Sequence, residues 1–265
     1  MKHVLVIKLG GMLLSSVFAM NNFFKTLYEY KKINQNILLV HGGEIWAKNL
    51  LSNTFSLNQE NKVFHLDYNN NVNNDFKFGI FSGTINSNIL KYAGLHGINA
   101  IGLHCTDGDT IIFKSSDIRD CIFYKNNSLT FINSLLKSNI MPIISPTAIT
   151  KDNLLINVDS DLIAVLLAQA FQARLIMLTD VSGVLDGKGH VIRKINYLMY
   201  EQLICDGIIS SGMLIKVNLA MQAAQYLKSP VNIAGCTDRI KLKKIFSGNA
   251  IGTIILNSDK ERSHA

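Results

Sequence analysis

The chain has 265 residues, of which 48% are hydrophobic and 17% charged, a composition that indicates a globular protein and excludes a disordered one. Its longest apolar run, residues 162–168, is far too short to span a bilayer, and we expect neither a signal peptide nor membrane contact, which predicts a cytoplasmic protein. The net charge of +7 is compatible with a nucleic-acid partner. However, the basic cluster 239–246 has no interleaved aromatic residues, so we expect one solvated helix face and no nucleic acid.

Apolar runs alternate along the chain with stretches whose apolar residues recur every three or four positions. The runs predict strands and the periodic stretches predict helices, the first of them capped by Ser15 or Ser16. The expected strands cover residues 3–8, 36–40, 98–103, 140–145, 174–179 and 230–234, and two later helices cover 161–172 and 212–228. This alternation is typical of an α/β fold with helices on both faces of a mainly parallel sheet. A soft domain boundary is expected near residues 150–160.

Two glycine-bearing turns follow the first two predicted strands. Residues 8–11 read Lys-Leu-Gly-Gly and residues 41–43 read His-Gly-Gly. Glycines let the backbone approach an anion closely, and a lysine at a strand end supplies a full positive charge. Each turn alone fits an ordinary strand-to-helix connection equally well. Together they favour a shared phosphate cradle.

Acidic residues follow two later strands. Asp159 and Asp161 lie where a helix begins, so they are candidate N-caps, but Asp161 is also placed to pair with lysines at the sheet edge. Asn157 offers a neutral donor to a polar substrate. The loop 178–189 contains Asp180 and a predicted hairpin turn at 186–189, and it fits either a plain two-turn loop or a nucleotide site.

The four cysteines are scattered and form no CxxC pair, which predicts reduced thiols and no metal site. In the predicted helix 212–228, Lys216 lies off the apolar stripe, and the default expectation for such a lysine is an exposed side chain. Walker A and GxGxxG patterns are absent, so neither a P-loop enzyme nor a Rossmann dehydrogenase is supported.

A set of segments occurs in the order typical of the amino acid kinase family, and it is most similar to the acetylglutamate kinases. The segments are IKLGG (7–11), VHGG (40–43), GTIN (83–86), GLHCTDGD (102–109), INVDSD (156–161), LTDVSGVLDGKG (178–189) and GMLIKVNLA (212–220). The resemblance spans residues 3–257. It implies an open three-layer αβα sandwich with a mainly parallel central sheet.

The resemblance also implies an activity and an assembly. The γ-phosphoryl group of ATP, accompanied by Mg²⁺, is transferred to the side-chain carboxylate of N-acetyl-L-glutamate, a step of arginine biosynthesis. An N-terminal lobe (1–155) is expected to bind this acceptor and to pair in a homodimer, and a C-terminal lobe (156–265) is expected to bind ATP. Partners are then small molecules only.

The resemblance also implies a role for each residue that matches a functional position of the family. Lys8 and Lys216 match the lysines that neutralise the transferred group, and Asp161 matches the carboxylate that orients them. The substrate-binding positions are Gly43, Glu44 and Asn157. The nucleotide-binding positions are Gly10, Gly11, Asp180, Val181, Ser182, Gly183, Val184, Leu185, Ile208, Ile209 and Ser210. No metal ligand from the protein is expected, because ATP and water hold Mg²⁺.

Three features depart from the family pattern. Glu44 stands where a third glycine is common, and Asp159 where asparagine is usual. In residues 62–76 no arginine occurs, although the family grips the acceptor's α-carboxylate there with one; Asp67 or His65 takes its place. Losing such a charged hydrogen bond costs about 1.5–3 kcal/mol. Three hypotheses therefore stay open: a kinase of N-acetyl-L-glutamate, with full or reduced activity; a binding or regulatory protein that keeps the fold and has lost catalysis; and a family kinase acting on another acid or phosphate.

Overall fold

The computed structural model describes residues 4–33, 36–47, 50, 77–114, 121–122, 128–235 and 238–257. The segment 62–76, for which the sequence predicts an acceptor-gripping loop, lies outside these residues.

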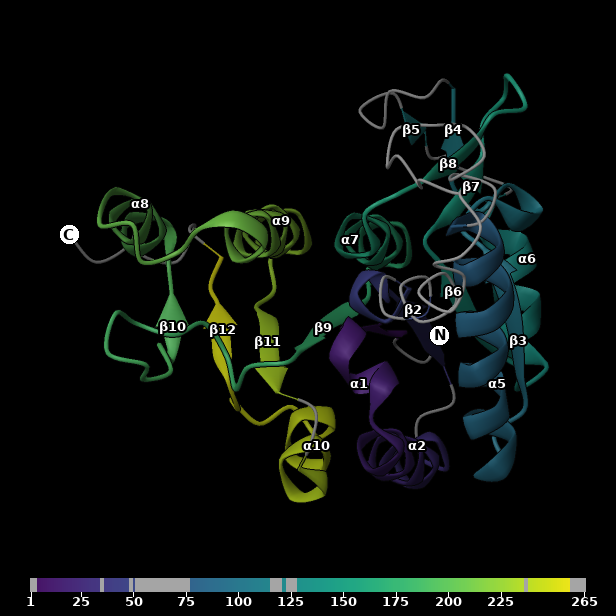
Figure 1. Ribbon diagram of the computed structural model, residues 1–265, viewed down its shortest axis with the longest axis horizontal. Helices are drawn as coiled ribbons and strands as arrows, with labels where there is room; N and C mark the ends of the chain where they lie inside the picture. Colours follow the sequence, from purple (N-terminus) through teal and green to yellow (C-terminus); the bar gives the residue numbers. More distant parts are fainter. Residues whose placement is uncertain are drawn as a thin grey trace, which may run out of the picture.

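An eight-stranded sheet forms the middle layer, in the order β10-β12-β11-β9-β1-β2-β6-β3 (Figure 1). Its neighbouring strands are parallel except β11 and β12, which confirms the prediction of a mainly parallel sheet. All six predicted strands are present. The strands are β1 (Leu5–Leu9), β2 (Ile37–His41), β3 (Ala100–His104), β6 (Met141–Ser145), β9 (Arg174–Thr179), β10 (Lys194–Ile195), β11 (Val231–Gly235) and β12 (Thr253–Ile255).

Helices cover both faces of this sheet, so the fold is the expected three-layer αβα sandwich. The helices α1 (Gly11–Ser15), α2 (Val17–Lys31), α5 (Asn86–Leu95) and α10 (Arg239–Phe246) contribute to the core on one face. The helices α6 (Ser128–Lys137), α7 (Ser160–Phe171), α8 (Tyr197–Cys205) and α9 (Ser211–Leu227) contribute to the core on the other face. In Figure 1, α7, α8 and α9 lie above the sheet and α1, α2 and α10 below it.

Successive side chains of the central strands point alternately into the two hydrophobic cores, one on each face of the sheet. In β1, Val6 packs in the core beneath α7 and α9, whereas Leu5, Ile7 and Leu9 pack in the core beneath α2 and α5. A strand buried on both faces reads as an unbroken apolar run, because successive side chains point to opposite sides and both sides are dry. This is why the strands were evident in the sequence.

Shorter elements complete the fold. Ser16 caps α2 by accepting from the Ala19 N–H, as predicted for Ser15 or Ser16. A π-helix, η1 (Gly79–Ile85), runs directly into α5, and a short 3₁₀ turn, η2 (Asp107–Asp109), follows β3. Two antiparallel hairpins pair β4 (Ile112–Phe113) with β5 (Cys121–Ile122) and β7 (Thr147–Ile149) with β8 (Leu155–Asn157).

Two further predictions concern the C-terminal half. The predicted hairpin at 186–189 is confirmed by the Leu185–Val191 bridge and by the hydrogen bond from the Asp186 N–H to the His190 carbonyl at 2.8 Å. The basic cluster 239–246 forms α10. Its apolar side is buried, while Arg239 and Lys243 pair with Glu29 of α2, so part of its charge ties two helices together.

Within the described ranges, no helix is long and apolar enough to cross a membrane. The same part of the chain contains no group of three or more His, Cys, Asp or Glu side chains able to hold a metal ion. Among the described residues, Cys105 is a buried free thiol and Cys205 an exposed one.

Candidate active site

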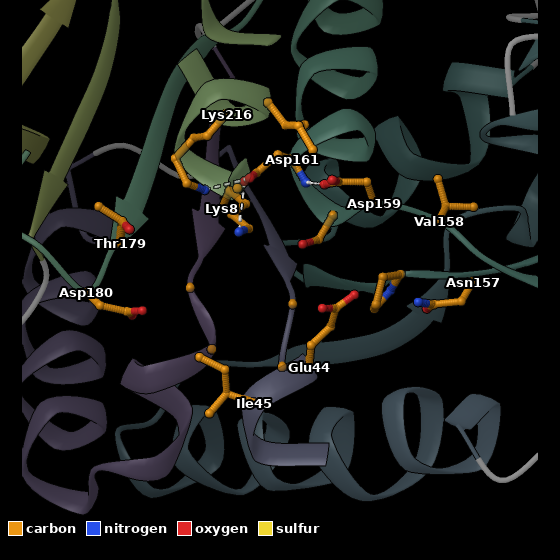
Figure 2. A pocket seen from close by; sticks show the side chains of 18 of the residues that line it. Lys8, Glu44, Ile45, Asn157, Val158, Asp159, Asp161, Thr179, Asp180 and Lys216 are labelled. Atoms are coloured by element: carbon orange, nitrogen blue, oxygen red, sulfur yellow. Dashed lines mark hydrogen bonds and ion pairs between the residues drawn. The ribbon is translucent and has the colours of Figure 1, made fainter. Parts of the chain in front are cut away.

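A cavity of about 370 Å³ opens at the carboxyl ends of β1, β2 and β9, near the centre of the sheet (Figure 2). Loops that follow adjacent parallel strands emerge at the same edge, and ligands of open α/β folds bind there. The strand register brings Lys8 of β1 beside Val40 of β2 and Met177 of β9. The start of α7 and the first turns of α9 close the remaining sides.

Lys8, Asp161 and Lys216 form a buried cluster of charges at the inner end of this cavity. The Asp161 carboxylate places Oδ1 at 2.8 Å from the Lys8 Nζ and Oδ2 at 2.5 Å from the Lys216 Nζ. The three side chains are only 8%, 10% and 11% exposed, in that order. The predicted pairing of Asp161 with lysines is therefore confirmed, and the default expectation of an exposed Lys216 is wrong.

Burial and charge set the ionisation of this cluster. Burial alone would raise the pKa of Asp161, but Lys8 and Lys216 outweigh it and hold the pKa below its usual value. Burial lowers the pKa of Lys216, and the positive charge of Lys8 lowers it further, while Asp161 opposes both. The Asp161 carboxylate thus lies between two lysine side chains and opposes the lowering of the Lys216 pKa.

The two glycine turns line the cavity from the sheet side. Gly10 and Gly11 follow β1, and Gly42 and Gly43 follow β2. Gly43 adopts φ +139°, and a Cβ there would lie 2.6 Å from the Ile85 Cδ1, so only glycine fits. The two turns lie side by side, since a Cβ added at Gly11 would stand 3.6 Å from the Gly43 Cα.

The acceptor-side residues predicted from the sequence also meet here. Glu44 and Asn157 line the cavity, and Figure 2 shows the Glu44 carboxylate directed into it. Asp159 accepts from the Asp161 N–H at 2.7 Å and is the N-cap of α7. Of the two roles weighed for Asp159 and Asp161, capping belongs to the first and lysine pairing to the second.

The residues predicted to bind the nucleotide divide into two groups. Asp180 lines the cavity beside the glycine turn of β1, and the N-terminal turns of α9 contribute Gly212 and Met213. The N-cap of α9, Ser210, makes no side-chain capping hydrogen bond, and its carbonyl oxygen accepts from the Met213 N–H at 3.1 Å. The remaining predicted positions do not line the cavity: Val181, Ser182, Gly183, Val184, Leu185, Ile208, Ile209 and Ser210. Of these, Val184 and Ile209 pack in the hydrophobic core.

Sequence reasoning missed several lining residues. Thr179 ends β9 and Ser160 begins α7. Neither was predicted as a site residue, because the acidic residues next to them drew the assignment. Phe81 enters from the π-helix and Pro146 from the turn after β6. Position at a strand end is a signal that could have found Thr179, whereas Phe81 carries no local signal, because its apolar side chain reads as core.

Comparisons with known proteins agree on one family. The model of the amino acid kinase family matches residues 3–235. An acetylglutamate kinase of Buchnera aphidicola subsp. Schizaphis graminum is 41% identical over 260 residues, covering 97% of this chain and 100% of that protein. An acetylglutamate kinase of Yersinia enterocolitica is 38% identical over 255 residues, covering 95% and 100%.

A solved structure supports the fold independently. The protein smu.665 from Streptococcus mutans UA159 superposes with a TM-score of 0.73 at 19% identity, covering 98% of this chain and 100% of that one. At this level of identity the likeness concerns the fold alone.

Proposed function

The chain belongs to the amino acid kinase family, and we propose that its cavity transfers the γ-phosphoryl group of ATP to the side-chain carboxylate of N-acetyl-L-glutamate. The product is N-acetyl-L-glutamyl 5-phosphate, and the step belongs to arginine biosynthesis. The relatives at about 40% identity over nearly the whole chain support this acceptor. No alternative is favoured by them.

The observation that carries the proposal is the buried Lys8–Asp161–Lys216 cluster at the inner end of the cavity. Phosphoryl transfer needs positioning and charge neutralisation more than covalent help from the protein. Two ammonium groups held on either side of one carboxylate supply fixed positive charge for the phosphate oxygens. Asp161 positions both lysines through ion pairs and prevents their mutual repulsion.

The rest of the cavity suggests how the two substrates share it. The backbone of Gly10, Gly11 and Gly43 lies between the nucleotide side and the acceptor side, where N–H donors stabilise the negative charge that grows on the moving group. Asp180 and the start of α9 are proposed to hold ATP, and Asn157 the acceptor. Attack by the acceptor carboxylate from one side and departure of ADP on the other is the in-line arrangement that this reaction uses.

Mg²⁺ is the proposed companion of ATP. Both oxygens of Asp161 face ammonium groups, so this carboxylate is not free to ligate a metal. The described residues around the cavity fit an ion held chiefly by phosphate oxygens and water, as Mg²⁺ commonly is. We also propose a homodimer paired through the N-terminal lobe (1–155), with ATP bound by the C-terminal lobe (156–265), and a cytoplasmic location, where ATP is available.

A coupled assay that follows ADP release with N-acetyl-L-glutamate and MgATP tests the activity. Lys8→Met and Lys216→Met should each lower kcat about 100-fold or more, the usual effect of removing one charge-stabilising donor. Lys91→Met is the matched control, because Lys91 is exposed on α5 far from the cluster in sequence and should leave kcat unchanged.

Absence of turnover by folded wild-type protein at saturating substrates would contradict the proposal. If ATP still binds under those conditions, measured by calorimetry, the binding or regulatory hypothesis takes its place. If other carboxylic acids are phosphorylated and N-acetyl-L-glutamate is not, the acceptor assignment is wrong while the kinase assignment stands.

A further inference from the structure

His41, the last residue of β2, is fully buried directly behind the cavity wall. Its Nδ1 lies 2.9 Å from the carbonyl oxygen of Gly42, and its Nε2 lies 3.2 Å from the Nδ2 of Asn86. The Asn86 amide can only donate through Nδ2, so Nε2 of His41 must accept. The ring therefore carries its proton on Nδ1 and donates it to the Gly42 carbonyl. Burial lowers the pKa of His41 to about 4, which keeps the ring neutral.

Asn86 is itself held in place from several sides. Its Nδ2 also donates to the Ile143 carbonyl of β6 at 3.1 Å, and its Oδ1 lies 1.9 Å from the point where a Cβ of Gly102 would stand. Only a glycine in β3 leaves room for this amide. Asn86 is the first residue after the π-helix, a local widening that is common near functional sites. The amide is thus fixed between β2, β3 and β6.

We infer that the His41–Asn86 pair is a positioning device for the Gly43 N–H, which it aims at the acceptor; this rests on the proposed function. In a trans peptide the C=O and N–H groups point to opposite sides. Because His41 holds the Gly42 carbonyl toward the core, the Gly43 N–H of the same peptide points away from the ring, and Gly43 lines the cavity.

The hydrogen bonds of the turn agree with this assignment. The Gly42 N–H donates to the Leu9 carbonyl at 3.1 Å, and the Gly43 carbonyl accepts from the Ala47 N–H at 2.8 Å. Among the described residues, the Gly43 N–H donates to no backbone carbonyl. Neither of these bonds acts on the Gly42–Gly43 peptide itself, which two glycines would otherwise leave free to rotate. The hydrogen bond from the His41 ring to the Gly42 carbonyl holds this peptide in one orientation. The Gly43 N–H is therefore oriented before the acceptor binds.

Two substitutions separate the two ring nitrogens. His41→Asn keeps an amide donor near the position of Nδ1, whereas His41→Gln keeps a polar group near Nε2 and loses the donor to Gly42. We expect His41→Gln to raise the KM for N-acetyl-L-glutamate about fivefold, the effect of one neutral hydrogen bond. The KM for ATP should change less than twofold, and His41→Asn should recover most of the lost acceptor affinity.

Equal effects of the two substitutions, or a parallel rise of both KM values, would overturn the inference, because a merely structural role predicts either. Thermal unfolding of both variants shows whether they fold. The tautomer of His41 can be tested in the wild-type protein, labelled with ¹⁵N-histidine, by NMR of the ring nitrogens. At pH 7 the spectrum should show a neutral ring that carries its proton on Nδ1. A proton on Nε2 instead would refute the inference. A wild-type protein that folds but does not turn over refutes the proposed function instead, and the ring measurement still decides the hydrogen bond.

Discussion

Removing the charge of Asp161 should destabilise the protein more than removing one of its lysine partners. Asp161→Asn leaves the Lys8 and Lys216 ammonium groups buried and facing each other, each about nine-tenths enclosed. Opposite charges about 4 Å apart attract by about 4 kcal/mol at an effective dielectric of about 20. The cost of burying the charges cancels much of this attraction. Breaking a buried pair still costs about 3–5 kcal/mol, because the remaining charge is uncompensated.

A double-mutant cycle makes the argument specific. Lys216→Met alone leaves the Lys8–Asp161 ion pair intact and should cost much less than Asp161→Asn. Adding Lys216→Met to Asp161→Asn removes one of the two repelling cations, so the double variant should be more stable than the Asp161→Asn variant. The expected coupling is about 1–3 kcal/mol, the range for residues in one ionic network.

Urea unfolding at pH 7.5, followed by circular dichroism, gives the free energy of unfolding of each variant. Asp152→Asn is the control, since Asp152 is exposed and such surface changes stay within about 0.5 kcal/mol. The reasoning is refuted if Lys216→Met further destabilises the Asp161→Asn variant, because the two ammonium groups would then not repel each other.

Three further predictions concern the cavity wall. Gly43→Ala should abolish most activity, because Gly43 has φ +139° and the added Cβ meets the Ile85 Cδ1 at 2.6 Å. Gly94→Ala, at an exposed position of α5 where an added Cβ meets nothing within 4 Å, should leave activity intact, so equal kcat values would contradict the steric argument. Glu44→Gln removes a carboxylate that is directed into the cavity, where the proposed acceptor is an anion, and it should lower the acceptor KM about fivefold, an effect of about 1 kcal/mol that weakens at high salt. An unchanged KM would mean that Glu44 does not face the acceptor. His41, whose pKa is lowered to about 4, stabilises the fold fully above the unfolded value of about 6.5, and this stability is lost as pH falls from there toward 4, by about 3 kcal/mol in total. Urea unfolding between pH 7.5 and pH 5 should therefore show a larger loss for the wild type than for His41→Asn, and equal losses would refute the shift.

The sequence determined the fold class and the order of its elements. β1, β2, β6 and β9 are buried on both faces, so each reads as an apolar run, and the glycine turns that follow β1 and β2 are visible as short motifs. The hairpin near residue 186 was equally plain, because its turn residues are adjacent in the chain. These features depend on local chemistry, and a single sequence contains all of it.

The site depended on contacts that no local pattern encodes. Lys216 and Asp161 are 55 positions apart, and helical periodicity placed the lysine off the apolar stripe of α9; only resemblance to a family pointed to it. The packing of α9 on α7 turns this apparently exposed side chain toward Asp161 and buries it. His41 and Asn86, 45 positions apart, gave no signal as a pair. Hydrogen bonds and ion pairs act over a few ångströms, so the tertiary structure alone decided which polar groups come within reach.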